Sequence, residues 1–235
     1  MMKIAIIPAR GGSKRIPRKN IRAFCGEPII AYSIKMAIES GLFDKVVVST
    51  DDQEIAEMAR LYGADTPFLR PAVLADDHKG TNAVINHALS WFRDHGEVFD
   101  TACCIYATAP FLQVEYLREG LDKLEASGRS FAFSVTSFEF PIQRSLRITR
   151  QGFIEAINPE YIFARSQDLE PAYHDAGQFY WGRSRAFLQS DILFSEASVP
   201  VILPRYLVHD IDTLEDWRRA EIAFEVLRRS GEVKE

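Results

Sequence analysis

Two carboxylates near the end of the chain are spaced to bind one metal ion. Asp210 and Asp212 lie in the segment HDIDT at 209–213, between an extended stretch and the last expected helix. Residues two apart in extended backbone point to the same side. Mg²⁺ prefers oxygen ligands of this kind and commonly also binds substrate phosphates. We therefore expect a Mg²⁺ site here, while Asp212 or Thr213 could equally cap the helix.

A basic loop near the start of the chain has the composition of a phosphate site. Residues 4–22 contain six basic residues and none that is acidic, although the whole chain has a net charge of -5. Gly11 and Gly12 follow an apolar strand and let main-chain N–H groups approach an anion closely. The basic side chains would neutralise a polyphosphate. The simpler alternative is a solvated basic loop. The patterns GxxxxGK[ST] and GxGxxG are both missing, so a P-loop NTPase and a dinucleotide-binding fold fit poorly.

The chemistry that these groups suggest is displacement at phosphorus. Arg10 and Lys19 could stabilise charge on a transferring phosphoryl group. Arg70 lies between Leu69 and Pro71 and could bind a base or a phosphate, or form only a structural ion pair. No Ser/His/Asp or Cys/His arrangement can be argued, so the substrate itself would be the nucleophile.

The elements that must position these residues alternate between apolar strands and amphipathic helices. Strands are expected at 4–7, 45–50, 101–106 and 130–135, with strand-like runs at 199–203 and 206–208. Helices are expected at 28–41, 51–63, 81–95, 115–126 and 213–229, with Asp51 and Glu54 forming a capping box. An irregular stretch at 66–75 and a polar turn at 76–80 separate the second and third helices.

This alternation predicts an α/β fold with a mainly parallel, Rossmann-like sheet and helices on both faces. Ligands of such sheets bind at the carboxyl ends of the strands, so the basic loop, Asp51 and Thr108 should share one edge. The whole chain, 1–235, is expected to be a single domain. Residues 137–182 break the rhythm with many aromatic side chains and are expected to form an inserted arm.

Composition excludes several classes of protein. The acidic balance argues against a nucleic-acid partner. No apolar run approaches the roughly 20 residues of a membrane span, and no signal peptide is visible, which favours the cytoplasm. The three cysteines and five histidines lack CxxC and HExxH spacing, so a zinc site is not supported.

The motifs together resemble the cytidylyltransferases that activate acidic sugars, the CMP-sialic acid and CMP-Kdo synthetase family. The matching segments are IPARGGSKRIPRKN (7–20), VVVSTDDQEIA (46–56), FLRP (68–71) and HDIDTLED (209–216). Within that family the branch that activates pseudaminic acid is most similar, through segments such as CCIYATAPF (103–111) and RSQDLEPAYHDAGQFYWG (165–182).

The resemblance implies a GT-A-like nucleotidyltransferase fold and a reaction in which CTP and pseudaminate give CMP-pseudaminate and pyrophosphate. It implies catalytic roles for Arg10, Lys19, Asp210 and Asp212, with the two aspartates holding Mg²⁺. Asn20 would reach the ribose, Arg70 the cytosine and Thr81 the sugar-phosphate region. The implied nucleotide-binding residues are Arg10, Gly11, Gly12, Ser13, Lys14, Arg15, Lys19, Asn20, Arg70 and Thr81.

The resemblance also implies a homodimer in which the arm crosses to the partner and helps to close its site for a nine-carbon acidic sugar. Tyr106 stands where the sialic acid branch has a glutamine, and Ala176 precedes Gly177 where that branch has asparagine. The candidate sugar-binding residues are Tyr106, Gln143, Arg144, Arg165, Gln167, His174 and Gln178.

Three alternatives stay open at this point. The sugar could be a related, sialic acid-like acid. The protein could be a glycosyltransferase in which Asp210-Ile211-Asp212 is the metal-binding DxD of a nucleotide-sugar site, although a loop that grips a triphosphate suits nucleotide activation better. It could also be a non-catalytic nucleotide-binding regulator.

Overall fold

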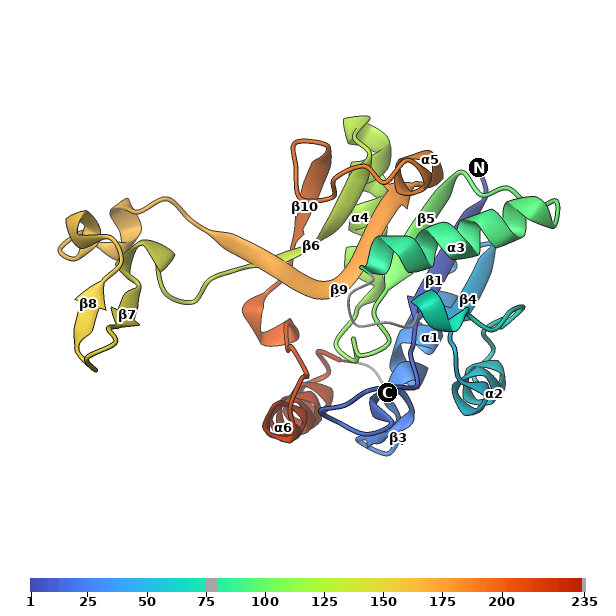
Figure 1. Cartoon of the computed structure of the whole chain (residues 1–235), viewed down its shortest axis with the longest axis horizontal. Helices are drawn as coiled ribbons and strands as arrows, with labels where there is room; N and C mark the ends of the chain where they lie inside the picture. The colour runs from blue at the N-terminus through green and yellow to red at the C-terminus, as the bar shows by residue number, and fades with distance from the viewer. Residues whose placement is uncertain (75–79, 234–235) are drawn as a thin grey trace.

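A six-stranded sheet runs through the middle of the molecule (Figure 1). The structure is a computed structural model, and it describes residues 1–74 and 80–233. The strand order is β10-β6-β9-β5-β1-β4. In chain order the six strands are β1 (Lys3–Pro8), β4 (Lys45–Ser49), β5 (Thr101–Ile105), β6 (Phe131–Ser137), β9 (Tyr173–Arg183) and β10 (Ser198–Ile202).

The expected mainly parallel sheet is confirmed. β1 pairs in parallel with both β4 and β5, and β10 pairs in parallel with β6. β9 lies between β5 and β6 and is antiparallel to both. The other five strands consequently point the same way and bring their carboxyl ends to one edge.

Helices cover both faces of the sheet, which explains why its strands are uniformly apolar. α1 (Ile29–Glu39), α2 (Gln53–Leu61) and α4 (Val114–Ser127) pack on one face, and α3 (Thr81–Asp94) and α5 (Ser184–Leu188) pack on the other. All five residues of β5 are buried, as expected for a strand covered on both sides. α6 (Leu214–Ser230) packs instead against α1 and the segment around Phe24, where β2 (Ala23–Phe24) and β3 (Glu27–Pro28) form a short hairpin.

The residues that begin two of the helices matter for the site. Asp52, and not Asp51 as the sequence suggested, caps α2, because its side chain accepts from the Ile55 N–H. Thr213 caps α6 and forms a capping box with Asp216. Asp51 therefore does not cap α2, and Asp212 does not cap α6.

Residues 138–172 project from the body as an arm that ends in a small hairpin of β7 (Leu146–Ile148) and β8 (Ile154–Ala156) (Figure 1). The expected boundary at 182 is wrong, because residues 173–182 form most of β9 in the central sheet. Three one-turn 3-10 helices complete the arm: Ile142–Arg144, Pro159–Tyr161 and Ser166–Asp168. Many of its apolar side chains are exposed, among them Phe140, Ile148, Phe153, Ile154 and Phe163.

Smaller expectations fared differently. The strand-like run at 206–208 is wrong, since Arg205–Leu207 forms a 3-10 helix. Two further 3-10 helices occupy Lys19–Ile21 and Ala72–Leu74. The polar turn at 76–80 lies outside the described residues except for Gly80. None of the helices in the described part of the chain has the length and apolar character that a bilayer crossing requires.

Candidate active site

The carboxyl edge of the sheet gathers most of the residues that the sequence singled out. The basic loop follows β1, Asp51 and Asp52 follow β4, and Tyr106 follows β5. The segment with Asp210 and Asp212 follows β10 and precedes α6. The expectation that these loops share one edge is therefore confirmed.

The basic loop meets the aspartate pair directly. The Lys19 ammonium donates to the carbonyl oxygen of Ile211 at 2.7 Å and lies 3.4 Å from Asp212 Oδ1. Arg15 Nη2 lies 2.8 Å from Asp212 Oδ2. Since Thr213 caps α6, the Asp212 carboxylate is engaged by the loop and not by the helix. Partial desolvation, and then the neighbouring Asp212 charge, raise the pKa of Asp210.

Three further acids, Asp51, Asp52 and Glu54, hold the other side of the basic loop. Asp51 Oδ1 accepts from the Gly11 N–H at 3.0 Å. Asp52 and Glu54 both bind the Arg18 guanidinium, with Arg18 Nη2 lying 3.0 Å from Asp52 Oδ1. The hydrogen bond from Arg18 holds the pKa of Asp52 below its usual range. Gly11 is also required by space, because an added Cβ would lie 2.6 Å from Asp52 Oδ2.

The role of these acids could have been found in the sequence. Asp51 and Asp52 follow a buried strand, as the basic loop does, and that position predicts a shared edge. However, Asp51 and Glu54 also fit the pattern of a capping box, which requires no contact with the loop. The acids act as counter-charges that fix the loop, a role that the sequence analysis missed.

Arg70 lies beneath this loop with its charge almost fully buried. Its side chain is 3% exposed, and its Nη2 lies 3.6 Å from Asp51 Oδ1. Burial lowers the pKa of Arg70, which Asp51 partly opposes. Its Nε is buried without a hydrogen-bond partner. Asn20, also buried, donates from Nδ2 to the carbonyl oxygen of Arg10 at 2.9 Å and so supports the loop from within.

Two hollows lie beside Tyr106. The first, about 380 Å³, is lined by Tyr106, Thr108, His174, Asp175, Ala176, Gly177, Val208, His209, Asp210 and Ile211. The second, about 290 Å³, is lined by Gly80, Thr81, Asn82, Ile85, Tyr106, Phe131, Asp175, Tyr180, Phe187, Asp191, Leu193 and Phe194. Tyr106 lines both hollows, so they adjoin at this residue. Its hydroxyl lies 3.3 Å from Oγ1 of Thr81, an expected nucleotide-binding residue.

The candidate sugar residues divide into two groups. Tyr106 and His174 line the hollow that contains Asp210. Gln178 is buried, and its amide donates to the carbonyl oxygen of Leu207, so it supports the end of the 3-10 helix that precedes Asp210. The remaining candidates, which lie on the arm and away from the sheet edge of their own chain, are Gln143, Arg144, Arg165 and Gln167.

Two of the arm candidates, Gln143 and Arg144, have partners within the arm itself. The Gln143 amide donates to the carbonyl oxygen of Glu170 at 2.8 Å, and Arg144 Nη2 donates to Ser166 Oγ at 2.6 Å. The chain alone does not bring them to the edge where Lys19 meets Asp212.

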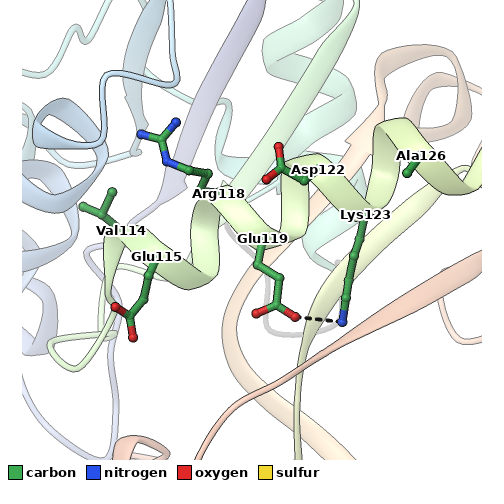
Figure 2. A pocket seen from close by; sticks show the side chains of 7 residues that line it. All are labelled: Val114, Glu115, Arg118, Glu119, Asp122, Lys123 and Ala126. Atoms are coloured by element: carbon green, nitrogen blue, oxygen red, sulfur yellow. Dashed lines mark ion pairs between the residues drawn. The ribbon is translucent and has the colours of Figure 1, made fainter.

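A third hollow, about 660 Å³, lies on the outer face of α4 and holds none of these groups (Figure 2). Its lining comes from a single helix: Val114, Glu115, Arg118, Glu119, Asp122, Lys123 and Ala126. Lys123 pairs with Glu119 at 2.8 Å along that helix. We read this surface as an ordinary solvated helix face.

The donor set at the edge fits Mg²⁺ only in part. The described residues hold no cluster of three or more His, Cys, Asp or Glu side chains that could enclose a metal ion. Two carboxylates, Asp210 and Asp212, stand together beside a basic loop. That arrangement suits Mg²⁺, which usually keeps several waters and shares its ligands with a substrate phosphate.

A glycine-containing basic loop facing two aspartates at the carboxyl edge of a mostly parallel sheet defines a nucleotide-binding α/β enzyme. Residues 4–186 match the model of the cytidylyltransferase family. The chain belongs to the cytidylyltransferase family and is a nucleotidyltransferase.

Individual relatives agree with this assignment. The chain is 45% identical to a pseudaminic acid cytidylyltransferase of Campylobacter jejuni, with 98% of this chain and 100% of the relative covered. It is 33% identical to a CMP-N,N'-diacetyllegionaminic acid synthase of Legionella pneumophila, with 96% and 97% covered. The fold matches a CMP:2-keto-3-deoxy-manno-octonic acid synthetase complexed with CTP at a TM-score of 0.69 and 15% identity, over 96% of this chain and 99% of that one.

Proposed function

We propose that the protein transfers CMP from CTP to the anomeric hydroxyl of pseudaminate and releases pyrophosphate. The observation that carries this proposal is the contact between the basic loop and the aspartate pair, in which the Lys19 ammonium joins the Ile211 carbonyl and Asp212. It creates one place where a triphosphate can be gripped from two sides. The 45% identity to a pseudaminic acid cytidylyltransferase over nearly the whole chain supports the choice of sugar.

The side chains of the edge supply binding and charge to this reaction. Arg10, Lys14, Arg15 and Lys19 carry the positive charge that a triphosphate requires, and both Arg15 and Lys19 contact the Asp212 carboxylate. The anomeric hydroxyl would attack the α-phosphorus in line, and pyrophosphate would leave with the P–O bond electrons. Asp210 and Asp212 would hold Mg²⁺, which when bound neutralises phosphate charge.

The nucleoside would lie over the buried part of the same edge. Arg70 would bind the cytosine or a phosphate, and its buried Nε without a partner supports this role. Asn20, which supports the basic loop, would contact the ribose. Gly11, Gly12 and Ser13 belong to that loop and would lie beneath the phosphates. Thr81 begins α3 beside Tyr106, at the boundary between nucleotide and sugar.

A homodimer would complete the sugar site. The arm exposes many large apolar side chains, with Phe163 96% exposed. Arms of two copies that cross would bury these side chains and bring Gln143, Arg144, Arg165 and Gln167 of one copy to the other's edge. Sedimentation should give a dimer, and replacing both Phe153 and Ile154 by Asp should give monomers that have lost sugar turnover but still bind CTP. A monomeric wild-type enzyme with full activity would refute this part of the proposal.

The alternatives are separated by substrate and by location. A related nine-carbon acid, such as the sugar of the legionaminic acid relative, is the main competitor for the sugar site. A glycosyltransferase would consume a CMP-sugar donor rapidly and CTP slowly, which the family assignment disfavours. We place the reaction in the cytoplasm, where the three free cysteines would stay reduced.

The decisive experiment is a screen of nine-carbon sugar acids against each nucleoside triphosphate, read as pyrophosphate release. Turnover with CTP and pseudaminate is expected, and turnover only with another sugar acid would refute the choice of sugar. Asp212→Asn should lose turnover while staying folded, which a non-catalytic regulator could not show. Asp122→Asn, on the outer face of α4, is the matched control and should keep full activity.

A further inference from the structure

Asp175 lies where the pairing between β9 and β6 becomes irregular. β9 loses its regular pairing with β6 between Asp175 and Tyr180, because only Ser134 of β6 lies opposite residues 176–179 of β9. The extra residues form a turn in which Gly177 has φ 61, and its N–H donates to Asp175 Oδ1 at 2.9 Å. The turn pushes the backbone toward the ring of Tyr106, 3.9 Å from the position of a Gly177 Cβ.

The second oxygen of Asp175 begins a chain of hydroxyl groups. Asp175 Oδ2 accepts from the Tyr180 hydroxyl at 2.5 Å. The Tyr180 hydroxyl also interacts with that of Tyr106, which in turn lies 3.3 Å from Thr81 Oγ1. Burial raises the pKa of Tyr180, so its hydroxyl stays protonated and remains a donor to the carboxylate.

Asp175 also stands on the wall that the two hollows share. Within the described part of the chain, only Tyr106 and Asp175 line both the hollow with Asp210 and the hollow with Thr81. Among the residues that the structure describes, the Thr81 hollow is walled mainly by apolar and aromatic side chains, and the charged ones that line it, Asp175 and Asp191, are acidic. An anionic part of a substrate would be repelled there, whereas an uncharged substituent would be accommodated.

The Asp175 carboxylate retains capacity to bind a ligand. A carboxylate offers about four acceptor positions on its two oxygens, and here each oxygen takes one hydrogen bond from the protein. The side chain is exposed, unlike Tyr180 behind it. Its remaining lone pairs therefore face the hollows, and the Gly177 N–H within the same turn fixes the direction of the carboxylate.

We propose that Asp175 determines which sugar acid the site accepts, by accepting a hydrogen bond from an N–H or O–H group on an uncharged substituent of the acceptor sugar. This inference rests on the proposed function and assigns a specificity role to a residue outside the nucleotide and metal sites. The sugar's own carboxylate would lie away from Asp175, toward the basic side chains of the edge or of the arm.

The test compares Asp175→Asn with Tyr180→Phe, using pyrophosphate release with CTP and whichever nine-carbon sugar acid the wild-type enzyme turns over. Asp175→Asn keeps the size of the side chain and one acceptor for the protein. It should raise KM for the sugar about tenfold to hundredfold, as expected for losing a charged hydrogen-bond acceptor, with KM for CTP within about twofold. Tyr180→Phe leaves the carboxylate in place and should change KM for the sugar less than about threefold.

The outcomes separate this inference from the proposed function. A wild-type enzyme with no turnover of any sugar acid overturns both. An active wild type with an unchanged Asp175→Asn variant overturns the inference alone. So does an equal rise in KM for CTP, or a Tyr180→Phe variant as impaired as Asp175→Asn, because either result would mean a structural role. Should the asparagine variant not fold, Asp175→Ser keeps an acceptor for the Gly177 N–H and replaces it.

Discussion

Replacing Asp51 by Asn should destabilise the protein, because it removes the counter-charge of a buried arginine. Asparagine keeps an oxygen that can accept from the Gly11 N–H, so that hydrogen bond, 3.0 Å in the native protein, can survive. What is lost is the negative charge 3.6 Å from the Arg70 guanidinium. The variant therefore isolates the electrostatic part of the contact.

The size of the effect follows from the exposure of the two partners. Breaking a fully buried ion pair costs about 3–5 kcal/mol, whereas an exposed pair contributes about 0–1 kcal/mol. The Arg70 side chain is 3% exposed, but that of Asp51 is 24% exposed, which places this pair between the two limits. We expect a loss of about 2 kcal/mol in the free energy of unfolding, or roughly 4–8 °C in Tm.

Urea unfolding of the two proteins measures this difference directly. Asp122→Asn removes an exposed carboxylate from α4 and should change stability by less than about 0.5 kcal/mol. In an Arg70→Met background, Asp51→Asn should cost almost nothing, since no buried charge is left to compensate. An Asp51→Asn variant as stable as the wild type, or one equally destabilised in both backgrounds, would refute the reasoning.

Three further predictions follow from the structure. Lys19→Met should lower kcat/KM about 100-fold or more in pyrophosphate release while the melting temperature changes little, since Lys19 supplies charge at the reacting edge. Burial and the charge of Arg70 lower the pKa of His87, so the unfolded chain binds its proton more readily and stability falls as pH drops below about 6.5. In His87→Phe the loss between pH 7.5 and 5.5, measured by urea unfolding at both, should shrink. Gly120→Ala should destabilise by about 1–3 kcal/mol despite better helix propensity, because its Cβ would lie 2.8 Å from the Trp181 ring, and equal or greater thermal stability would contradict this.

The architecture could be predicted because burial on both faces leaves a clear mark on a sequence. β1, β4 and β5 are short, continuous apolar runs, and each is followed by polar or glycine-containing residues that end at the same edge. The same reasoning predicts that the basic loop and the Asp210–Asp212 pair lie at this edge. They are about 190 residues apart in the sequence, and the contact between Lys19 and Asp212 joins them.

The parts that could not be predicted depend on contacts distant in the sequence. The sequence-based boundaries include most of β9 in the arm. Its mixture of aromatic, charged and glycine residues has no strand periodicity, and the turn at Gly177 interrupts the strand. Asp51 was read as a cap, since an isolated letter pattern cannot reveal that the Gly11 N–H lies beside it. Asp175 offered no pattern at all, because its significance arises only where β9 passes Tyr106.

The central position of β9 also constrains how the chain can fold. β5 and β6 each pair with β9 and not with one another, so β6 is not joined to the strands β4, β1 and β5 until residues 173–183 are available. On the ribosome, the edges of β5 and β6 that will flank β9 stay unpaired while the whole arm is synthesised. Such edges are sites of intermolecular pairing. We therefore expect chains that end before residue 173 to aggregate, and refolding of the full chain to be limited by insertion of this one strand.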